Sequence, residues 1–256
     1  MSVQSIDNLQ HVIDHDLCNR CGTCVGLSGG SIVFGDKTGD YLPGVIADIS
    51  PDLADRIWNA CPGKNFDFPG YRKLHFSEAP HFHLYTGAYQ NIFIGYANDE
   101  NVRRNSASGG ILTAILLWLL KNRLIDGAVV TRMSKKEPWL AETFIATTPE
   151  GIIEAAQSKY IITSVNEILP QMEAFEGKLA YVGLPGQVQG IRKLQAANDP
   201  SVRNIEYIFG PFYGNTLHFS SIKSFLRSHG ERNFKDIASL HFRYGEWPGN
   251  MRIEMK

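Results

Sequence analysis

Hydrophobic and polar residues follow two different patterns along the 256-residue chain. Up to about residue 85, the sequence is irregular and rich in glycine and proline, and it predicts one short helix. That helix has Ser50 as its N-cap, Pro51 at its first position and an apolar stripe through Leu53 and Ile57. From about residue 90, short apolar runs alternate with longer segments of helical periodicity. The change predicts a small N-terminal module followed by a larger domain.

The larger region predicts strands separated by helices, which is typical of an α/β domain with a mostly parallel sheet. The expected strands are 91–97, 127–131, 142–147, 178–183 and 204–209. The expected helices are 110–121, which should be largely buried, a short one opened by Thr148-Pro149, one opened by a Ser164/Glu167 capping box, 187–197 and 220–228.

We expect two units, residues 1–85 and residues 86–256. Near the end, 241–243 and 251–256 resemble a hairpin whose second strand stops at the last residue. We therefore expect the chain to be C-terminally incomplete.

Charge and hydropathy exclude several classes of protein. The 25 basic and 26 acidic residues leave a net charge of −1, which provides no general attraction to nucleic acid. The longest apolar run, 111–120, is about half of the roughly 20 residues that a membrane-spanning helix needs. The N-terminus lacks the apolar segment of a secretory signal. We expect a cytoplasmic protein without a membrane span.

The four cysteines carry the strongest chemical signal. Cys18, Cys21 and Cys24 are spaced as C-x2-C-x2-C, which puts three thiolates on one tight loop. In the bacterial ferredoxin pattern, a fourth cysteine follows three residues later, but Ser28 stands there. The remaining cysteine, Cys61, precedes a proline. The set favours one 4Fe-4S cluster with no ligand left for a second.

Two other interpretations of the cysteines stay open at this point. Four thiolates also suit structural zinc, although zinc ribbons usually pair two C-x2-C knuckles. The cysteines can also be plain thiols in a reducing compartment. A disulfide-stapled secreted domain would be smaller and richer in cysteine.

Three polar or glycine-rich segments lie where α/β sheets bind ligands, at the turns between elements. They are Asn105–Gly110 before the most apolar helix, Gly183–Gly190 after a buried strand, and Gln157–Tyr160. Free N–H groups at a helix start can hold a phosphate or a flavin carbonyl. Capping, close packing and a solvated turn are the structural alternatives.

Together these segments resemble one family. The cluster motif, NSASGGILTAIL, IDGAVV, AAQSKY, YVGLPGQVQGIRKL and HFRYGEWPG occur in the order seen in the coenzyme F(420) hydrogenase/dehydrogenase beta-subunit family. That family includes the 7-hydroxymethyl chlorophyll a reductases. Relatives often carry cysteines where this chain has Gly186 and Gly210-Pro211, and these support a second cluster that is not expected here.

The resemblance implies an oxidoreductase that passes electrons between a 4Fe-4S cluster, FAD and an organic substrate or redox partner. By that resemblance, the cluster ligands are Cys18, Cys21, Cys24 and Cys61. The residues implied around the flavin are Ser106, Ser108, Gly109, Gly110, Thr113, Lys159, Tyr160, Gly183 and Gln187. A ferredoxin or a redox partner subunit is the implied electron donor, and no catalytic residue is assigned.

Two further functions are compatible with the same sequence. One is an electron-transfer subunit without substrate chemistry of its own. The other is a non-redox descendant in a polysaccharide pathway. The substrate, the direction of electron flow and the oligomeric state are not determined by the sequence.

Overall fold

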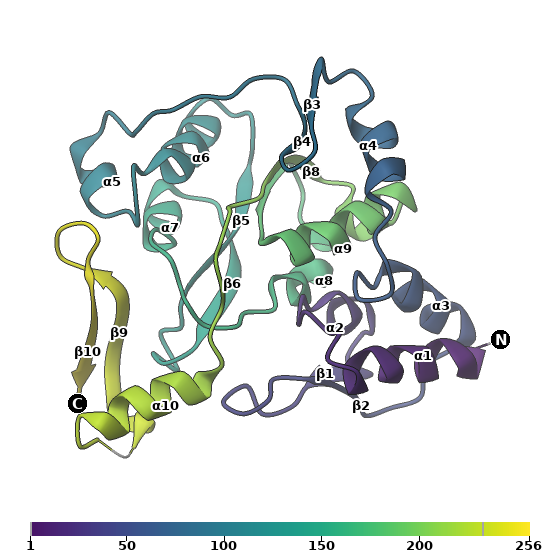
Figure 1. The fold of residues 1–256 in the computed structure, drawn as a ribbon, viewed down its shortest axis with the longest axis horizontal. Helices are drawn as coiled ribbons and strands as arrows, with labels where there is room; N and C mark the ends of the chain where they lie inside the picture. The colour runs from purple at the N-terminus through teal and green to yellow at the C-terminus, as the bar shows by residue number, and fades with distance from the viewer. Residues whose placement is uncertain (1, 232) are drawn as a thin grey trace.

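The computed structural model describes residues 2–231 and 233–256. Its N-terminal region contains more regular structure than the sequence predicts (Figure 1). The elements are α1 (Ser2–Asp14), α2 (Thr23–Leu27), β1 (Ile32–Phe34), β2 (Pro43–Val45), α3 (Pro51–Ala60), α4 (Phe68–Phe76), β3 (His81–His83) and β4 (Gly87–Tyr89). The strands pair antiparallel as two small hairpins, β1 with β2 and β3 with β4.

The predicted α/β fold is confirmed by a four-stranded sheet in the order β6-β5-β7-β8. Its strands are β5 (Gly127–Met133), β6 (Ala141–Ala146), β7 (Leu179–Val182) and β8 (Ile205–Phe209). Strands β5, β7 and β8 run parallel, while β6 pairs antiparallel with β5. The sheet is therefore mostly parallel, with one antiparallel edge.

Helices and a further hairpin surround the sheet and extend beyond it. They are α5 (Glu100–Arg104), α6 (Ile111–Lys121), α7 (Pro149–Glu154), the 3-10 turn η1 (Val165–Ile168), α8 (Leu169–Ala174), α9 (Pro185–Ala196), η2 (Pro200–Val202), α10 (Phe219–Ser228), η3 (Phe234–Asp236), β9 (Ile237–Tyr244) and β10 (Asn250–Met255). No helix among the described residues is long and apolar enough to cross a bilayer.

Each face of the sheet has its own hydrophobic core, because successive strand residues point to opposite sides. Val129 and Tyr181 pack with residues of α1, α2, α3, α8 and α9. Ala128, Val130 and Ala180 pack with residues of α6 and α7. The N-terminal region thus shares one core with the sheet, which holds the cysteine loop against it; the division at residue 85 stays a prediction.

A third core joins α10 to the C-terminal hairpin. Phe219, Ile237 and Leu240 are buried there together with Trp139, from the β5–β6 connection. The predicted hairpin is confirmed, and β9 pairs antiparallel with β10. The residues just before α10 are also bound to the segment before η1, because the Leu217 carbonyl accepts a backbone hydrogen bond of 3.3 Å from Ile162.

Two expectations about the N-terminal half are wrong. The first residues form α1, because Leu9, Val12 and Ile13 make a helically spaced stripe that is buried in the structure. Residues 91–97 form no strand. Ile94 is fully exposed and Phe93 is 87% exposed, so no neighbouring strand buries either face of this segment.

Two helices also differ from expectation. In α6 only Leu116 and Leu119 are buried, and Trp118 is 57% exposed, because a single stripe of the helix packs on the sheet. The Ser164/Glu167 capping box does not form. The hydroxyl of Ser164 donates instead to the Glu167 carboxylate, and the helical segment begins with the 3-10 turn η1 before α8.

Candidate functional site

The four cysteines line one small cavity, although the β1–β2 hairpin and α3 lie between the third and the fourth. Cys18 and Cys21 lie on the loop after α1, and Cys24 lies in the first turn of α2. Cys61 is the C-cap of α3. The structure therefore brings together all four of the predicted ligands.

Glycine makes the tight loop between these cysteines possible. Gly22 has a φ of 87°, in the left-handed region that side chains disfavour. A Cβ on Gly22 would also lie 2.8 Å from the backbone nitrogen of Glu167. The loop therefore packs directly against η1, and this contact fixes the positions of Cys21 and Cys24.

The cysteines are buried enough to disfavour their charged forms. Burial raises the pKa of Cys18 and of Cys24, and it raises the pKa of Cys21 to about 11. Neighbouring cysteines raise all three pKa values further, while a hydrogen bond from Thr23 lowers that of Cys21. A cationic group bound among the sulfurs would relieve both penalties.

The sulfur geometry bears on which metal group fits. Within residues 2–231 and 233–256, no three His, Cys, Asp or Glu side chains are placed to hold one metal ion. Zinc requires its thiolates to converge on a single ion at about 2.3 Å. A 4Fe-4S cluster takes four cysteines, one for each iron. The four cysteines that line the cavity match the donor set of such a cluster in number and kind.

A buried hydrogen-bond network lies behind Cys21. The Thr23 hydroxyl lies 3.2 Å from Cys21 Sγ and accepts a hydrogen bond of 2.9 Å from Asn166 Nδ2. The Asn166 amide also donates to the Gln187 carbonyl at 3.0 Å, and Tyr181 donates to Asn166 Oδ1. Asn166 was not predicted as a site residue, and no local motif marks it.

A lysine supports the fourth cysteine. Lys193 Nζ donates to the Cys61 carbonyl at 2.6 Å and to Asn65 Oδ1 at 3.3 Å. Burial lowers the pKa of Lys193, while the nearby Cys61 raises it. The predicted helix 187–197 includes this residue, but the sequence gives no sign of its contact with Cys61.

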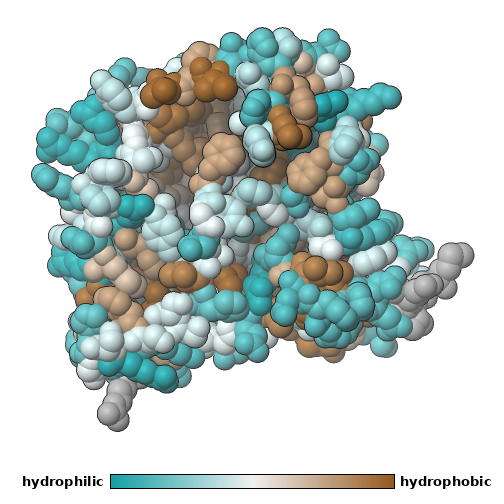
Figure 2. Space-filling model, in the orientation of Figure 1, coloured by the Kyte–Doolittle hydropathy of each residue, from teal (hydrophilic) through white to brown (hydrophobic). Residues whose placement is uncertain are grey.

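A second, larger cavity of about 560 Å³ opens beside the sheet. It lies where β7 ends and α9 begins, and the start of α6 and the loop after α7 close it from other sides. In Figure 2, hydrophobic side chains gather around a hollow in the upper half of the view. All nine residues predicted around a flavin line this cavity: Ser106, Ser108, Gly109, Gly110, Thr113, Lys159, Tyr160, Gly183 and Gln187.

The N-terminus of α6 faces the cavity with uncapped backbone donors. Gly110 is its N-cap with a φ of 76°, and no side chain caps the helix. Ile111 and Thr113, in the first turn, line the cavity. The Ser106 hydroxyl donates to the Val102 carbonyl at 2.6 Å. The free N–H groups make this end suited to an anion.

Lys159 is anchored by the segment just before it, and Tyr160 is anchored by β9. Lys159 Nζ donates to three backbone carbonyls, those of Ala155, Ala156 and Gln157, at 2.6, 2.7 and 3.1 Å. Burial lowers its pKa to about 7. Tyr160 accepts two hydrogen bonds from Arg243 of β9, at 3.0 and 2.7 Å. Both residues therefore shape the cavity wall.

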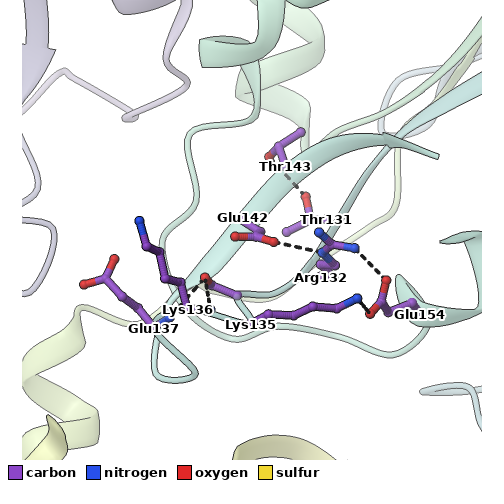
Figure 3. A network of polar contacts seen from close by, with 9 residues as sticks. Thr131, Arg132, Lys135, Lys136, Glu137, Glu142, Thr143 and Glu154 are labelled. Atoms are coloured by element: carbon purple, nitrogen blue, oxygen red, sulfur yellow. Dashed lines mark hydrogen bonds and ion pairs between the residues drawn. The ribbon is translucent and has the colours of Figure 1, made fainter.

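Ion pairs hold α7, which ends just before the carbonyls that Lys159 contacts (Figure 3). Arg132 of β5 pairs with Glu142 of β6 at 2.9 Å and with Glu154, the last residue of α7, at 2.6 Å. Lys135 binds the same Glu154 at 2.8 Å. The end of α7 is thus held to the sheet immediately before Ala155, where the Lys159 contacts begin.

Gln187 connects two walls of the cavity. Its Oε1 accepts a hydrogen bond of 2.7 Å from the Leu184 backbone, and its Nε2 donates to the Thr163 carbonyl at 2.7 Å. Its own carbonyl accepts from Asn166, which also contacts Thr23 beside Cys21. Asn166 and Gln187 therefore link the cysteine loop to the large cavity.

Family models identify this architecture. The model for coenzyme F(420) hydrogenase/dehydrogenase, beta subunit N-term, matches residues 92–170, and the model for the C terminus of the same beta subunit matches residues 176–256. The two matches together cover more than half of the chain. The chain belongs to this family. The four cysteines precede both matched ranges.

Similar proteins extend the match toward the N-terminus. The coenzyme F(420)-dependent sulfite reductase of Methanocaldococcus jannaschii is 28% identical in an alignment of 236 residues that covers 87% of this chain and 34% of that protein. The coenzyme F(420) hydrogenase subunit beta of Methanosarcina barkeri is 24% identical over 64% of this chain and 57% of that protein. This chain thus spans about a third and just over half of these relatives.

A solved structure shares the fold. A chain of the F(420)-reducing NiFe hydrogenase complex from Methanosarcina barkeri aligns with a TM-score of 0.51 and 22% identity. The alignment covers 62% of this chain and 58% of that chain. Over the aligned part, this chain therefore has the same fold as a chain of that hydrogenase complex.

Proposed function

We propose that this chain is an electron-transferring oxidoreductase module that holds one 4Fe-4S cluster and FAD. The observation that carries the proposal is the pair of neighbouring cavities, one lined by all four cysteines and one lined by all nine expected flavin residues. The names of its relatives refer to coenzyme F(420), so this deazaflavin is the first organic electron carrier to test.

The donor set supports the cluster. Cys18, Cys21, Cys24 and Cys61 would each bind one iron, and the loop around Gly22 holds three of them on a short stretch of chain. The residues around the sulfurs are largely apolar, with Leu9, Val12 and Phe34 lining the same cavity. This surrounding excludes water from the sulfurs on the protein side.

The shape and polarity of the large cavity support FAD. Its volume of about 560 Å³ lies within the range of cofactor sites, roughly 300–1,000 Å³. Gly109 and Gly110 leave the α6 N-terminus accessible, and its free N–H groups suit the pyrophosphate. Val130 and Val182 provide apolar walls for a flat ring.

The chain's residues hold and orient the cofactors in this proposal. A bound cluster exchanges single electrons and a bound flavin stores two, so together they can convert single-electron transfer into hydride transfer. The Asn166 amide keeps the Cys21 loop and Gln187 at a fixed separation. Lys159 and Arg243 fix the wall that carries Tyr160. A ferredoxin or a partner subunit would supply electrons on the cysteine side.

Anaerobic purification with iron, sulfide and flavin measured on the same sample tests the proposal. We expect about four irons per chain, a broad visible absorption band and released FAD, after reconstitution if needed. The Cys61→Ser variant should lose iron while keeping flavin. Ser28→Ala is the control, because Ser28 stands where the ferredoxin pattern has its fourth cysteine and is not a predicted ligand in this chain.

Each outcome separates the alternatives. Iron without flavin favours an electron-transfer subunit without its own substrate chemistry. Zinc without iron, even after anaerobic reconstitution, would overturn the redox proposal and favour a non-redox descendant. Reduction of the bound flavin by reduced coenzyme F(420) would extend the proposal to that carrier.

A further inference from the structure

Thr23 lies between a cysteine sulfur and a buried amide. Its hydroxyl oxygen is 3.2 Å from Cys21 Sγ on one side and 2.9 Å from Asn166 Nδ2 on the other. Thr23 is 1% exposed and Asn166 is fully buried, so solvent does not compete for these groups. The directions of the hydrogen bonds can therefore be assigned from the partners alone.

The Asn166 amide has only one orientation that satisfies its surroundings. The Gln187 carbonyl can only accept, so the atom 3.0 Å from it must be the amide nitrogen. Tyr181 then donates its hydroxyl to the amide oxygen. The second hydrogen of the nitrogen points to Thr23, whose oxygen accepts it. The hydroxyl hydrogen of Thr23 is left for Cys21 Sγ.

We infer that Tyr181, Asn166 and Thr23 form a relay that directs a hydroxyl donor at Cys21 and raises the reduction potential of the cluster. The inference rests on the proposed cluster and assigns these residues a role in setting its potential. Thr23 contacts the ligand, whereas Asn166 and Tyr181 are positioning residues. A donor at a cluster sulfur stabilises the extra negative charge of the reduced state, which makes reduction more favourable.

The surrounding backbone is shaped for this contact. Gly190 of α9 lies against it, and a Cβ there would overlap Thr23 Oγ1 and lie 3.0 Å from Asn166 Nδ2. The Asn166 backbone also donates to the Cys21 carbonyl at 2.9 Å. Asn166 is therefore held to the loop through its main chain as well as its side chain, which keeps its amide directed at the Thr23 hydroxyl.

The test compares Thr23→Val with Thr23→Ser in the anaerobically loaded protein. Valine has nearly the shape of threonine without the hydroxyl, and serine keeps the hydroxyl. We expect the midpoint potential of the cluster, measured by potentiometry with EPR detection, to become more negative in Thr23→Val. Thr23→Ser should remain close to the wild type. Thr143→Val, on β6, is the control for the same substitution far from the cysteines.

Tyr181→Phe tests the residue of the relay that lies farthest from Cys21. It also keeps the inference testable if Thr23→Val fails to bind the cluster. It removes only the donor to Asn166 and should shift the potential in the same direction by a smaller amount. Equal potentials in the wild type and Tyr181→Phe, together with an unshifted or clusterless Thr23→Val, would overturn the relay. A wild-type protein that takes up no cluster would instead overturn the proposed function, so the two failures are distinguishable.

Discussion

Lys193 Nζ donates a hydrogen bond of 2.6 Å to the carbonyl oxygen of Cys61, a residue 132 positions earlier in the chain. The contact ties α9, which follows the sheet's central strand, to the last predicted cluster ligand. A hydrogen bond from a charged donor contributes about 1.5–3 kcal/mol. The buried amine therefore holds Cys61 in place independently of any metal.

Lys193→Met should lower the free energy of unfolding of the metal-free protein by about 1–3 kcal/mol, because it removes this charged hydrogen bond and leaves the Cys61 carbonyl with only the Lys64 backbone N–H, 3.4 Å away. Urea unfolding monitored by circular dichroism measures the effect. Lys73→Met, on the exposed surface of α4, is the control and should change the value by less than about 0.5 kcal/mol. Equal effects of the two substitutions would contradict the assigned role.

The Lys159 amine should make stability depend on pH. Burial lowers its pKa from 10.5 to about 7 in the folded chain, while the unfolded chain keeps the ordinary value. Between about pH 7 and pH 10, the unfolded state therefore binds more protons. The free energy of unfolding should rise with pH across this window, and the amine's unfavourable contribution should be complete below pH 7.

Lys159→Met isolates this effect from the other groups that ionise in the same range. The unfolding free energy of the wild type minus that of Lys159→Met should increase between pH 6 and pH 9. Lys121→Met, at the exposed end of α6, is the control for the same substitution at a solvent-exposed lysine. A constant difference for Lys159→Met would show that the three carbonyls keep the amine charged throughout.

Local pattern was sufficient for the elements of the sheet and for the cysteine set. The short apolar runs that form β5, β7 and β8 are local signals, and so is the C-x2-C-x2-C spacing. Local turns mark the three polar or glycine-rich segments, because parallel strands end at one edge of a sheet, whereas the family resemblance implies the set of nine residues. The structure places all nine on one cavity, and their contact with a flavin stays a prediction.

The relationships that could not be predicted are those between distant parts of the chain. Asn166 contacts Thr23, and Lys193 contacts Cys61, across more than 120 residues, and neither pair has a sequence motif. The apolar run 91–97 resembles a strand by composition, but strand formation needs a neighbour that the tertiary fold does not provide. By contrast, the stripe of α1 is a local signal from which that helix could have been predicted.

Gly186, in the first turn of α9, has the Asn19 side chain lying against it. A Cβ there would lie 2.5 Å from Nδ2 of Asn19, which stands between two predicted cluster ligands. Asn19 Oδ1 accepts a hydrogen bond of 3.2 Å from the Cys21 backbone, so displacing Asn19 would disturb the loop. Gly186→Ala should therefore destabilise the protein by about 1–3 kcal/mol.

Gly210→Ala is the matched control, because a Cβ at Gly210 meets nothing within 4 Å. Thermal or urea unfolding compares the two variants. In the Asn19→Ala background, Gly186→Ala should become much less destabilising, since the clashing group is absent. An undiminished cost in that background would place the strain elsewhere.

The turn at Gly110 should govern FAD binding through the backbone of α6. Alanine at its φ of 76° costs roughly 1–2 kcal/mol, and its Cβ would lie 3.1 Å from Ser106 Oγ and 3.2 Å from the Val102 carbonyl. Relief of these contacts moves the first turn of α6, whose N–H groups face the cavity. Gly110→Ala should weaken FAD binding about tenfold, or about 1.4 kcal/mol.

Gly230→Ala separates this effect from the backbone penalty. Gly230 has a φ of 86°, a Cβ there meets nothing within 4 Å, and the residue lies outside the cavity lining. Both variants should lose stability in urea unfolding because of the positive φ, and Gly110→Ala should lose more because of its tight contacts. Only Gly110→Ala should lose affinity when flavin fluorescence is followed during binding. Equal FAD affinity in the two variants would mean that the shape of this turn does not determine binding, and that the cavity holds FAD through its other walls.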